Sequence, residues 1–242
     1  GIQVGGLVSN VSREARLLGV SNLDPEKSTN FTLGIGLKPA PNFNITFDYF
    51  SINLTDRIIL STEIKSTGGT TPLDQILSSN NLSDLSFFVN ALDTKTSGLD
   101  FVANYRAIKF GTGKLGVSLA GNVMLQNERS GAVKNLKLIS DAGQSVVNLT
   151  QEALFFTSRP KFKTILGLDY EVSRFIFTLG NTLFGPTKFK QQGLDANLYT
   201  EFKTKLVTDL AITFQASKNS TVALNINNLF NVLPEWEFKA EN

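Results

Sequence analysis

The two side chains most often used for acid–base and nucleophilic chemistry, histidine and cysteine, are both absent from this chain of 242 residues. Without His there is no Ser-His-Asp triad and no imidazole proton shuttle. Without Cys as well, the usual zinc ligand sets and any disulfide framework are impossible. Carboxylates remain available for catalysis, but the 21 acidic residues are scattered along the chain. We therefore expect no catalytic residue, no metal site and no cofactor.

Several polar side chains with a possible binding role fall within stretches that otherwise read as apolar strands. Each lies on the non-apolar side of its predicted strand, where a ligand or a partner would be contacted. Ordinary solvation and charge balance on a wet face would explain the same residues. Lys+Arg 23 against Asp+Glu 21 leaves no strongly basic face, so no nucleic-acid partner is expected. The candidates are Asp48, Asp100, Asn104 and Arg106, joined by Asp169 if its strand keeps the same phase.

The elements that must position these residues are strands, because apolar and polar residues alternate with period two along most of the chain. Between 31 and 37, and again between 43 and 49, every second residue is apolar. The pattern predicts about eight strands, most of them near the 9–11 residues that a tilted membrane strand requires. The same alternation returns at 99–105, 115–125, 166–170, 175–183, 206–214 and 222–226.

The connections between these strands alternate in length. Short turns are predicted near 39–42, 111–114, 171–174 and 217–220, and they separate long segments near 60–97, 127–160 and 185–203. Short turns at one end and long loops at the other are typical of outer-membrane barrels. We therefore expect an all-β fold, namely antiparallel up-and-down transmembrane β-barrel strands in a partial barrel, with long extracellular loops.

Two short helices are predicted within the long segments, at 72–82 and 149–156. These loops could form part of a substrate mouth, or their apolar residues could only cap the loops. Tyr199 and Trp236 also fall in predicted loops, where an aromatic ring could stack on a planar ligand. A soluble, secreted β-sandwich that binds carbohydrate would share the alternation of the strands, and a passive porin-like barrel would share both the alternation and the loops.

Four short stretches give the sequence a familiar appearance. Residues 22–28 (NLDPEKS) precede a strand, a proline turn and a second strand that ends at Asp56-Arg57-Ile58. Gly98-Leu99-Asp100 begins another strand, and Ser158-Arg159-Pro160 precedes a further one. An alternating strand is followed by Asn-Leu-Phe-Asn at 228–231. In this order, over about residues 20–240, they resemble the C-terminal part of the β-barrel of TonB-dependent outer-membrane receptors.

The resemblance implies energised uptake of a scarce nutrient, such as a ferric siderophore, across the outer membrane of a Gram-negative bacterium. Its implied partners are the TonB complex through a plug domain, outer-membrane lipid and a small nutrient ligand. Residues 1–242 would then be a single β-barrel segment that lacks the plug domain and the final strand. Asp48, Asp100, Asn104 and Arg106 would face the lumen and contact the plug or the substrate. The resemblance implies a receptor, not an enzyme.

Overall fold

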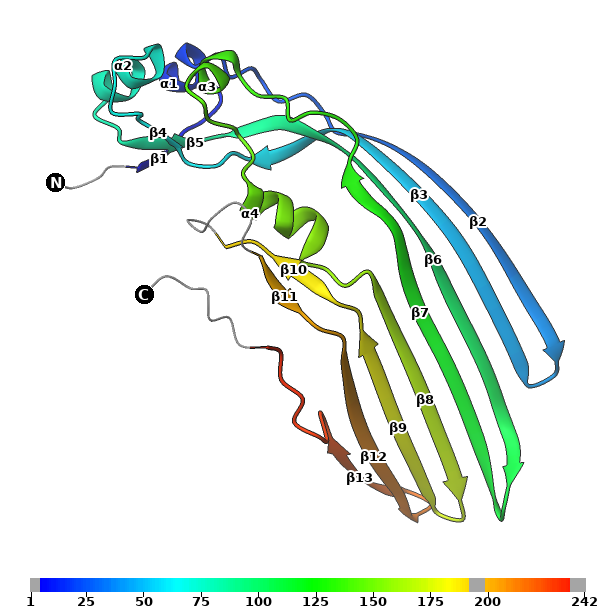
Figure 1. Ribbon diagram of the computed structural model, residues 1–242. Coiled ribbons are helices and arrows are strands. Elements are labelled where there is room, and N and C mark those ends of the chain that lie inside the picture. The colour runs from blue at the N-terminus through cyan, green and yellow to red at the C-terminus, as the bar shows by residue number, and fades with distance from the viewer. Residues whose placement is uncertain (1–4, 192–198, 236–242) are drawn as a thin grey trace. The chain divides into compact units, whose positions relative to one another are not determined.

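The computed structural model describes residues 5–191 and 199–235 of the chain (Figure 1). The chain divides into two compact units, which are considered separately. The loop unit comprises Gly1–Asn30, Ile52–Thr96 and Asn127–Glu152. The strand unit comprises Phe31–Ser51, Ser97–Gln126 and Ala153–Asn242.

Eight long strands form one sheet in the order β13-β12-β9-β8-β7-β6-β3-β2, so neighbours in space are neighbours along the chain. This is the predicted up-and-down arrangement. All four predicted short turns are confirmed, and each connects its two strands through two residues. The strands are β2 (Lys27–Ala40), β3 (Phe43–Leu60), β6 (Phe88–Phe110), β7 (Gly113–Arg129), β8 (Phe162–Val172), β9 (Phe175–Phe184), β12 (Lys205–Ser217) and β13 (Ser220–Ile226).

The long segment predicted at 60–97 is shorter in the structure, because β6 begins at Phe88. Its first ten residues have mixed burial and no apolar alternation, so the period-two pattern first appears near Leu99. Strand pairing with neighbours, which the sequence of one segment does not display, extends β6 beyond the length that a bilayer requires.

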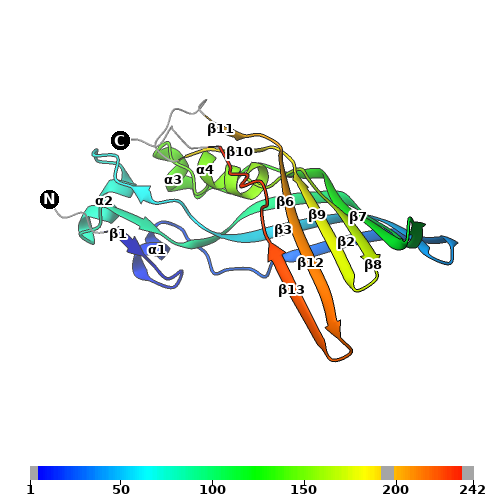
Figure 2. The ribbon, with the colours of Figure 1, turned by 90° about the horizontal axis from the view of Figure 1, so that it is seen from below.

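The sheet of the strand unit has two chemically different faces. Paired residues lie on the same face, and the pairs Val117–Leu168, Leu168–Leu179 and Leu179–Leu210 belong to an apolar face. From β7 to β13 this face carries no Lys, Arg, Asp or Glu, and Figure 2 shows β8, β9, β12 and β13 side by side. Its residues on these strands are Leu115, Val117, Leu119, Gly121, Val123, Phe162, Thr164, Leu166, Leu168, Tyr170, Val172, Phe175, Phe177, Leu179, Asn181, Leu183, Leu206, Thr208, Leu210, Ile212, Phe214, Val222, Leu224 and Ile226.

Aromatic rings gather on the apolar face near the short turns. Phe110 and Tyr170 meet edge to face with 5.9 Å between ring centroids, and the Tyr170 hydroxyl donates to the Phe110 carbonyl at 3.3 Å. The Tyr170 ring lies so close to Gly113 that any side chain there would clash with it. Phe175 stacks on Phe214 at 4.7 Å. These aromatic contacts therefore stabilise the end of the sheet at which the short turns lie.

The loop unit is built around a conventional hydrophobic core. A three-stranded sheet in the order β1-β5-β4 packs with short helices, and Phe87, Leu73 and Leu85 are completely buried. The predicted helices at 72–82 and 149–156 are confirmed, while two others escaped prediction because each spans only five residues. The elements are β1 (Gly5–Leu7), α1 (Arg13–Leu17), β4 (Ile64–Lys65), α2 (Pro72–Ser79), β5 (Asp84–Ser86), α3 (Lys137–Asp141) and α4 (Leu149–Glu152).

Three further elements belong to the strand unit: the π-helical turn η1 (Ala153–Thr157), β10 (Thr187–Phe189) and β11 (Thr200–Phe202). β10 and β11 pair as a short antiparallel ribbon within the segment predicted as a loop at 185–203. Across the described residues, no helix has the length and apolar character needed to cross a membrane.

Candidate functional site

The face of the strand unit opposite the apolar face, called the polar face here, carries two acidic residues that each accept a hydrogen bond from a neighbouring strand. The Asn122 amide donates to Asp100 at 2.6 Å. The Thr178 hydroxyl donates to Asp169 at 2.7 Å. These partners lie on adjacent strands, so each carboxylate links two strands across the polar face.

The four residues predicted to face the lumen occupy separate positions. A side chain at Gly34 would meet the Asp48 carboxylate, so the glycine makes room for it. Arg106 is exposed near the turn end, where its backbone N–H donates to the Asn42 carbonyl at 3.0 Å. Within the described contacts, no hydrogen bond or ion pair joins any two of Asp48, Asp100, Asn104 and Arg106. They are distributed along β3 and β6 and do not form one cluster, and their proposed contacts with plug or substrate stay a prediction.

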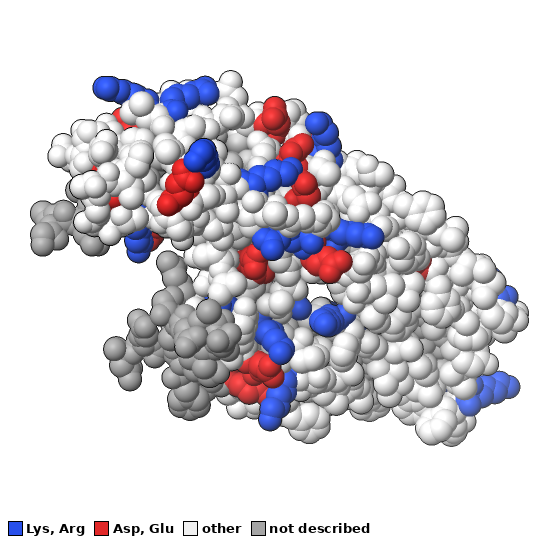
Figure 3. Space-filling view, turned by 45° about the horizontal axis from the view of Figure 1, so that its top comes forward, with Lys and Arg blue, Asp and Glu red and all other residues white. Residues whose placement is uncertain are grey.

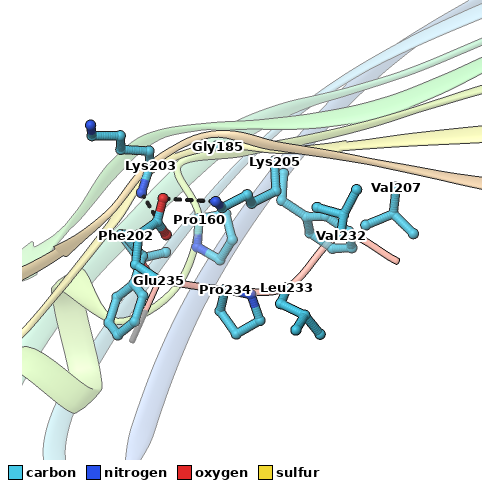
Figure 4. Close-up of a pocket in the computed structure, with 12 residues that line it drawn as sticks. Pro160, Gly185, Phe202, Lys203, Lys205, Val207, Val232, Leu233, Pro234 and Glu235 are labelled. Carbon is cyan, nitrogen blue, oxygen red and sulfur yellow. Dashed lines mark hydrogen bonds and ion pairs between the residues drawn. The ribbon is translucent and has the colours of Figure 1, made fainter. Parts of the chain in front are cut away.

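A pocket of about 280 Å³ opens in the strand unit where β9, β12 and the chain after β13 meet (Figure 4). Most of its lining is apolar. One ion pair crosses it: the Lys205 ammonium lies 2.8 Å from the Glu235 carboxylate, which also accepts the Lys203 backbone N–H at 3.3 Å. The lining residues are Pro160, Phe184, Gly185, Thr187, Phe202, Lys203, Lys205, Val207, Val232, Leu233, Pro234 and Glu235.

Electrostatics at this pocket favour ionised groups. The hydrogen bond from Lys205 holds the pKa of Glu235 below its usual value. In Figure 4 the Glu235 carboxylate points toward Lys205, whereas the Lys203 side chain extends away from it. Phe184 lines the pocket, and the Lys163 ammonium lies 5.3 Å from the centre of the Phe184 ring. Such a pocket can hold a small apolar or amphiphilic group.

The Asn-Leu-Phe-Asn stretch explains how the chain reaches this pocket. Asn228 adopts a left-handed conformation (φ 50°), which asparagine tolerates better than most residues. Its backbone N–H donates to Asp209 at 2.7 Å, and its side-chain amide bonds the backbone of Val232 in both directions, at 3.0 and 2.8 Å. The motif thus makes a turn that places Val232–Glu235 along the pocket. Sequence reasoning recognised the motif but not the role of Asp209.

A second polar cluster, in the loop unit, unites the two ends of the longest sequence motif. Glu26 accepts the Ile58 backbone N–H at 2.6 Å, which joins the NLDPEKS stretch to Asp56-Arg57-Ile58. The Lys134 ammonium contacts Asp56 at 2.9 Å and Asp93 at 2.7 Å, and these two hydrogen bonds raise the pKa of Lys134. Sequence reasoning missed Lys134 because it lies 78 residues beyond Asp56 and 41 beyond Asp93.

Neither cluster has the composition of a metal centre. Among residues 5–191 and 199–235, no three acidic side chains are placed to hold one metal ion together. The Lys190 ammonium lies 5.7 Å from the centre of the Tyr199 ring, and stacking of Tyr199 on a ligand stays a prediction. Trp236, which was predicted to do the same, lies outside the described residues.

Comparison with known proteins matches residues 5–229 to the family described as TonB dependent receptor-like, beta-barrel. Curated proteins yield no significant match.

Solved structures of three bacterial proteins share the fold. The ferric enterobactin receptor of Pseudomonas aeruginosa aligns with a TM-score of 0.55 and 16% identity, over 85% of this chain and 26% of that one. The siderophore receptor PirA of Acinetobacter baumannii aligns with a TM-score of 0.58 and 15% identity, over 86% of this chain and 28% of that one. The FrpB iron transporter of Neisseria meningitidis aligns with a TM-score of 0.56 and 14% identity, over 95% of this chain and 28% of that one. The chain therefore spans about a quarter of the length of these proteins.

Proposed function

This chain belongs to the TonB-dependent receptor β-barrel family, and from that premise we propose that it supplies part of the barrel wall and outer loops of a receptor for energised nutrient uptake. The family is one of outer-membrane receptors of Gram-negative bacteria, and the protein is located in that membrane. Ferric siderophores are the proposed substrate class, supported by the ferric enterobactin and siderophore receptors that share the fold. The proposed role is transport without a catalytic step.

The observation that carries the proposal is the uncharged apolar face of the strand unit. Phe31, Leu33 and Ile35 on the edge strand β2 are 56–66% exposed, as are other apolar residues of the sheet. In water such a continuous surface would be an aggregation hazard, whereas lipid covers it at no cost. Figure 3 shows a broad area without charged side chains. We propose that outer-membrane lipid covers this face.

The polar face would then line the lumen of the barrel. Asp48, Asp100, Asn104 and Arg106 are proposed to contact the plug domain or the substrate, since lumen positions tolerate polar groups that the lipid side does not. The TonB complex would act through the plug domain. All residues of the chain are proposed to belong to a single barrel segment.

Uptake by intact cells tests this function directly. A strain lacking the full-length protein should fail to accumulate at least one radiolabelled ferric siderophore from a panel of catecholate, hydroxamate and carboxylate types. Deletion of TonB should abolish the same uptake, and the complemented strain should recover it. Normal accumulation of every member of the panel in the deletion strain would reject siderophores as the substrate class. Uptake that persists without TonB would indicate a passive barrel.

A further inference from the structure

The apolar face of the strand unit is interrupted by three polar side chains, called the polar stripe here: Thr164 on β8, Asn181 on β9 and Thr208 on β12. Asn181 pairs with Leu166 on one side and with Thr208 on the other, and Thr164 lies two residues from Leu166. The three residues are therefore neighbours on strands that Figure 2 shows side by side. Tyr170 on the same face is different, because it lies near the turn end and its hydroxyl is already bonded.

The polar stripe lies in the middle of the apolar face and not at its ends. On β7 the apolar run of this face extends from Leu115 to Val123, with Leu119 at its centre. Leu119 pairs with Leu166, and Leu166 pairs with Asn181. At the ends of a lipid-facing surface, water and headgroups can bind a polar side chain, whereas acyl chains surround the centre. Because lipid is proposed to cover this face, the stripe depends on protein groups for its hydrogen bonds.

Hydrogen bonding within the stripe is incomplete. The Thr208 hydroxyl, on a residue that is 4% exposed, donates to the Asn181 Oδ1 at 2.9 Å. This bond orients the amide, and among the described residues neither the Asn181 NH₂ nor the Thr164 hydroxyl has a hydrogen-bond partner. Asn181 and Thr164 are partly exposed, so a group outside the chain can reach them. An amide NH₂ without an acceptor is costly in hydrocarbon, and the stripe therefore requires an external acceptor.

The Asn181 side chain can supply that acceptor itself when two copies of the protein meet. Its NH₂ group has two donors, and its Oδ1 has a second lone pair beyond the one that Thr208 uses. Two copies inserted in one membrane in the same orientation carry Asn181 at the same depth. A two-fold axis along the membrane normal would then let the two amides exchange a pair of N–H···O bonds.

The surroundings of the stripe suit such a contact. From β7 to β13 the apolar face carries no charged side chain, so two identical copies would not repel each other there. Leu166 and Leu206, which flank the stripe, are 36% and 50% exposed and would pack on the partner. The small threonines would let the two sheets approach closely, as small residues do between transmembrane segments. Acyl chains would cover the leucines equally well but would offer the amide no acceptor.

We propose that two copies of the receptor associate side by side in the outer membrane through this part of the wall, with paired Asn181 side chains at the two-fold axis. The inference rests on the proposed lipid contact of the apolar face, and it goes beyond that contact by assigning one patch of the face to a second copy. Thr208 would hold each amide in its orientation, and Thr164 would lie beside the paired amides.

Energy transfer between labelled copies tests the association. Full-length receptor with Asn219→Cys is labelled in the exposed turn between β12 and β13, since this chain has no cysteine of its own. Donor-labelled and acceptor-labelled receptor are mixed in lipid vesicles at a series of protein-to-lipid ratios. Transfer should exceed that of randomly distributed monomers and should follow a monomer–dimer equilibrium. Transfer that matches random monomers at every ratio, in folded receptor, would overturn the proposal.

Variants of the stripe locate the contact. Asn181→Leu combined with Thr208→Val removes both partners of the internal hydrogen bond, so neither is left unpaired. The association constant should fall by about tenfold, because two hydrogen bonds between the copies are lost. Folding into vesicles should be unimpaired, since lipid solvates the apolar replacements. Asn225→Leu, on the opposite face of β13, is the matched control and should leave the association unchanged.

The outcomes separate the dimer from the proposed function. Heat-modifiable gel mobility in the same vesicles reports whether the barrel has folded and inserted. Wild-type receptor that inserts and remains monomeric would refute the dimer and leave the lipid-facing wall intact. Equal association of the wild type and the double variant would refute the contact at Asn181. Receptor that does not insert would refute the lipid contact, and the dimer with it.

Discussion

The loop unit and the strand unit bury their apolar residues in opposite ways. Within residues 5–191 and 199–235, all of the almost fully buried apolar residues lie in the loop unit, with the single exception of Ala153. In the strand unit, by contrast, large side chains such as Leu33 and Val222 are more than 60% exposed. The same hydrophobic residue types are therefore buried in a protein core in one unit and exposed on a sheet face in the other. In the loop unit they avoid water by packing on one another, and on the apolar face they are proposed to contact lipid.

Because of this difference, the two units should be sensitive to different kinds of substitution. A packed core is sensitive to the volume of each side chain, because cavities within it are not refilled. A lipid-facing surface is sensitive to polarity, since lipid adapts to shape but solvates charge poorly. Substitutions that change side-chain volume should therefore destabilise the loop unit most. Substitutions that introduce a charge should most strongly impair folding of the strand unit when they lie on its apolar face.

Truncation in the loop-unit core should have the largest effect. Phe87→Ala is expected to destabilise the loop unit by about 3–5 kcal/mol, because Phe87 is completely buried. Phe88→Ala is the matched control: the adjacent ring is 43% exposed and should cost about 1 kcal/mol or less. Hydrogen exchange of α2 and β5 in the full-length protein measures both. Equal exchange rates in the two variants would mean that the loop unit has no core of the kind described.

The second largest effect is expected from a charge introduced on the apolar face. Leu179→Lys is expected to cost about 2–4 kcal/mol in a bilayer near the membrane midplane, and it should reduce folding yield into lipid vesicles. The neighbouring residue on the polar face provides the control. Thr178→Lys places the same charge beside Asp169 and should fold almost normally. If the two lysine variants fold equally well in vesicles, the apolar face does not contact lipid.

Acid should weaken the loop unit selectively through Asp74. This buried carboxylate accepts hydrogen bonds from Ser66, Thr67 and Thr71, and these bonds lower its pKa from 3.8. A carboxylate with a lowered folded-state pKa contributes stability that is fully present above pH 3.8 and is lost as the pH falls through the folded-state value.

Hydrogen exchange of α2 checks this expectation. Protection of α2 should be constant from pH 7 to pH 5 after correction for intrinsic rates, and it should decline below pH 4. In Asp74→Asn the helix should be less protected and should lose this pH dependence. Asp141→Asn, at a carboxylate paired with Lys137 on the exposed surface, should change little. A wild-type-like pH profile in Asp74→Asn would contradict the role assigned to Asp74.

The smallest effect is expected at the pocket of the strand unit. Glu235→Gln removes the ion pair with Lys205, whose two side chains are about 30% exposed. We expect no measurable change in unfolding of the barrel, but faster exchange at 229–235 that high salt reproduces in the wild type. Asp209→Asn should loosen the same segment by weakening the bond to the Asn228 N–H. Unchanged exchange in both variants would show that these carboxylates do not hold the segment.

Much of the strand unit follows from local sequence. The two-residue turns after Ala40, Phe110, Val172 and Ser217 were predicted from turn residues between alternating strands, and the sheet order follows because short turns force neighbours to pair. The helix at Pro72 was also predicted, and its capping box of Thr71 and Asp74 is visible in the sequence. In each case the contacts that determine the structure lie within a few residues.

The clusters and pockets were decided by tertiary structure. Lys134 reaches Asp56 and Asp93, and Asp209 holds Asn228, only because strand register and loop packing bring distant segments together. The alternation of polar and apolar residues determines which face a residue occupies, and therefore placed Asp100 correctly on the polar face. It contains no information on how far one strand slides along another or on how a long loop folds back. Those depend on the summed packing of many residues, so the sequence determined the two-faced sheet while the tertiary structure alone decided which polar groups meet.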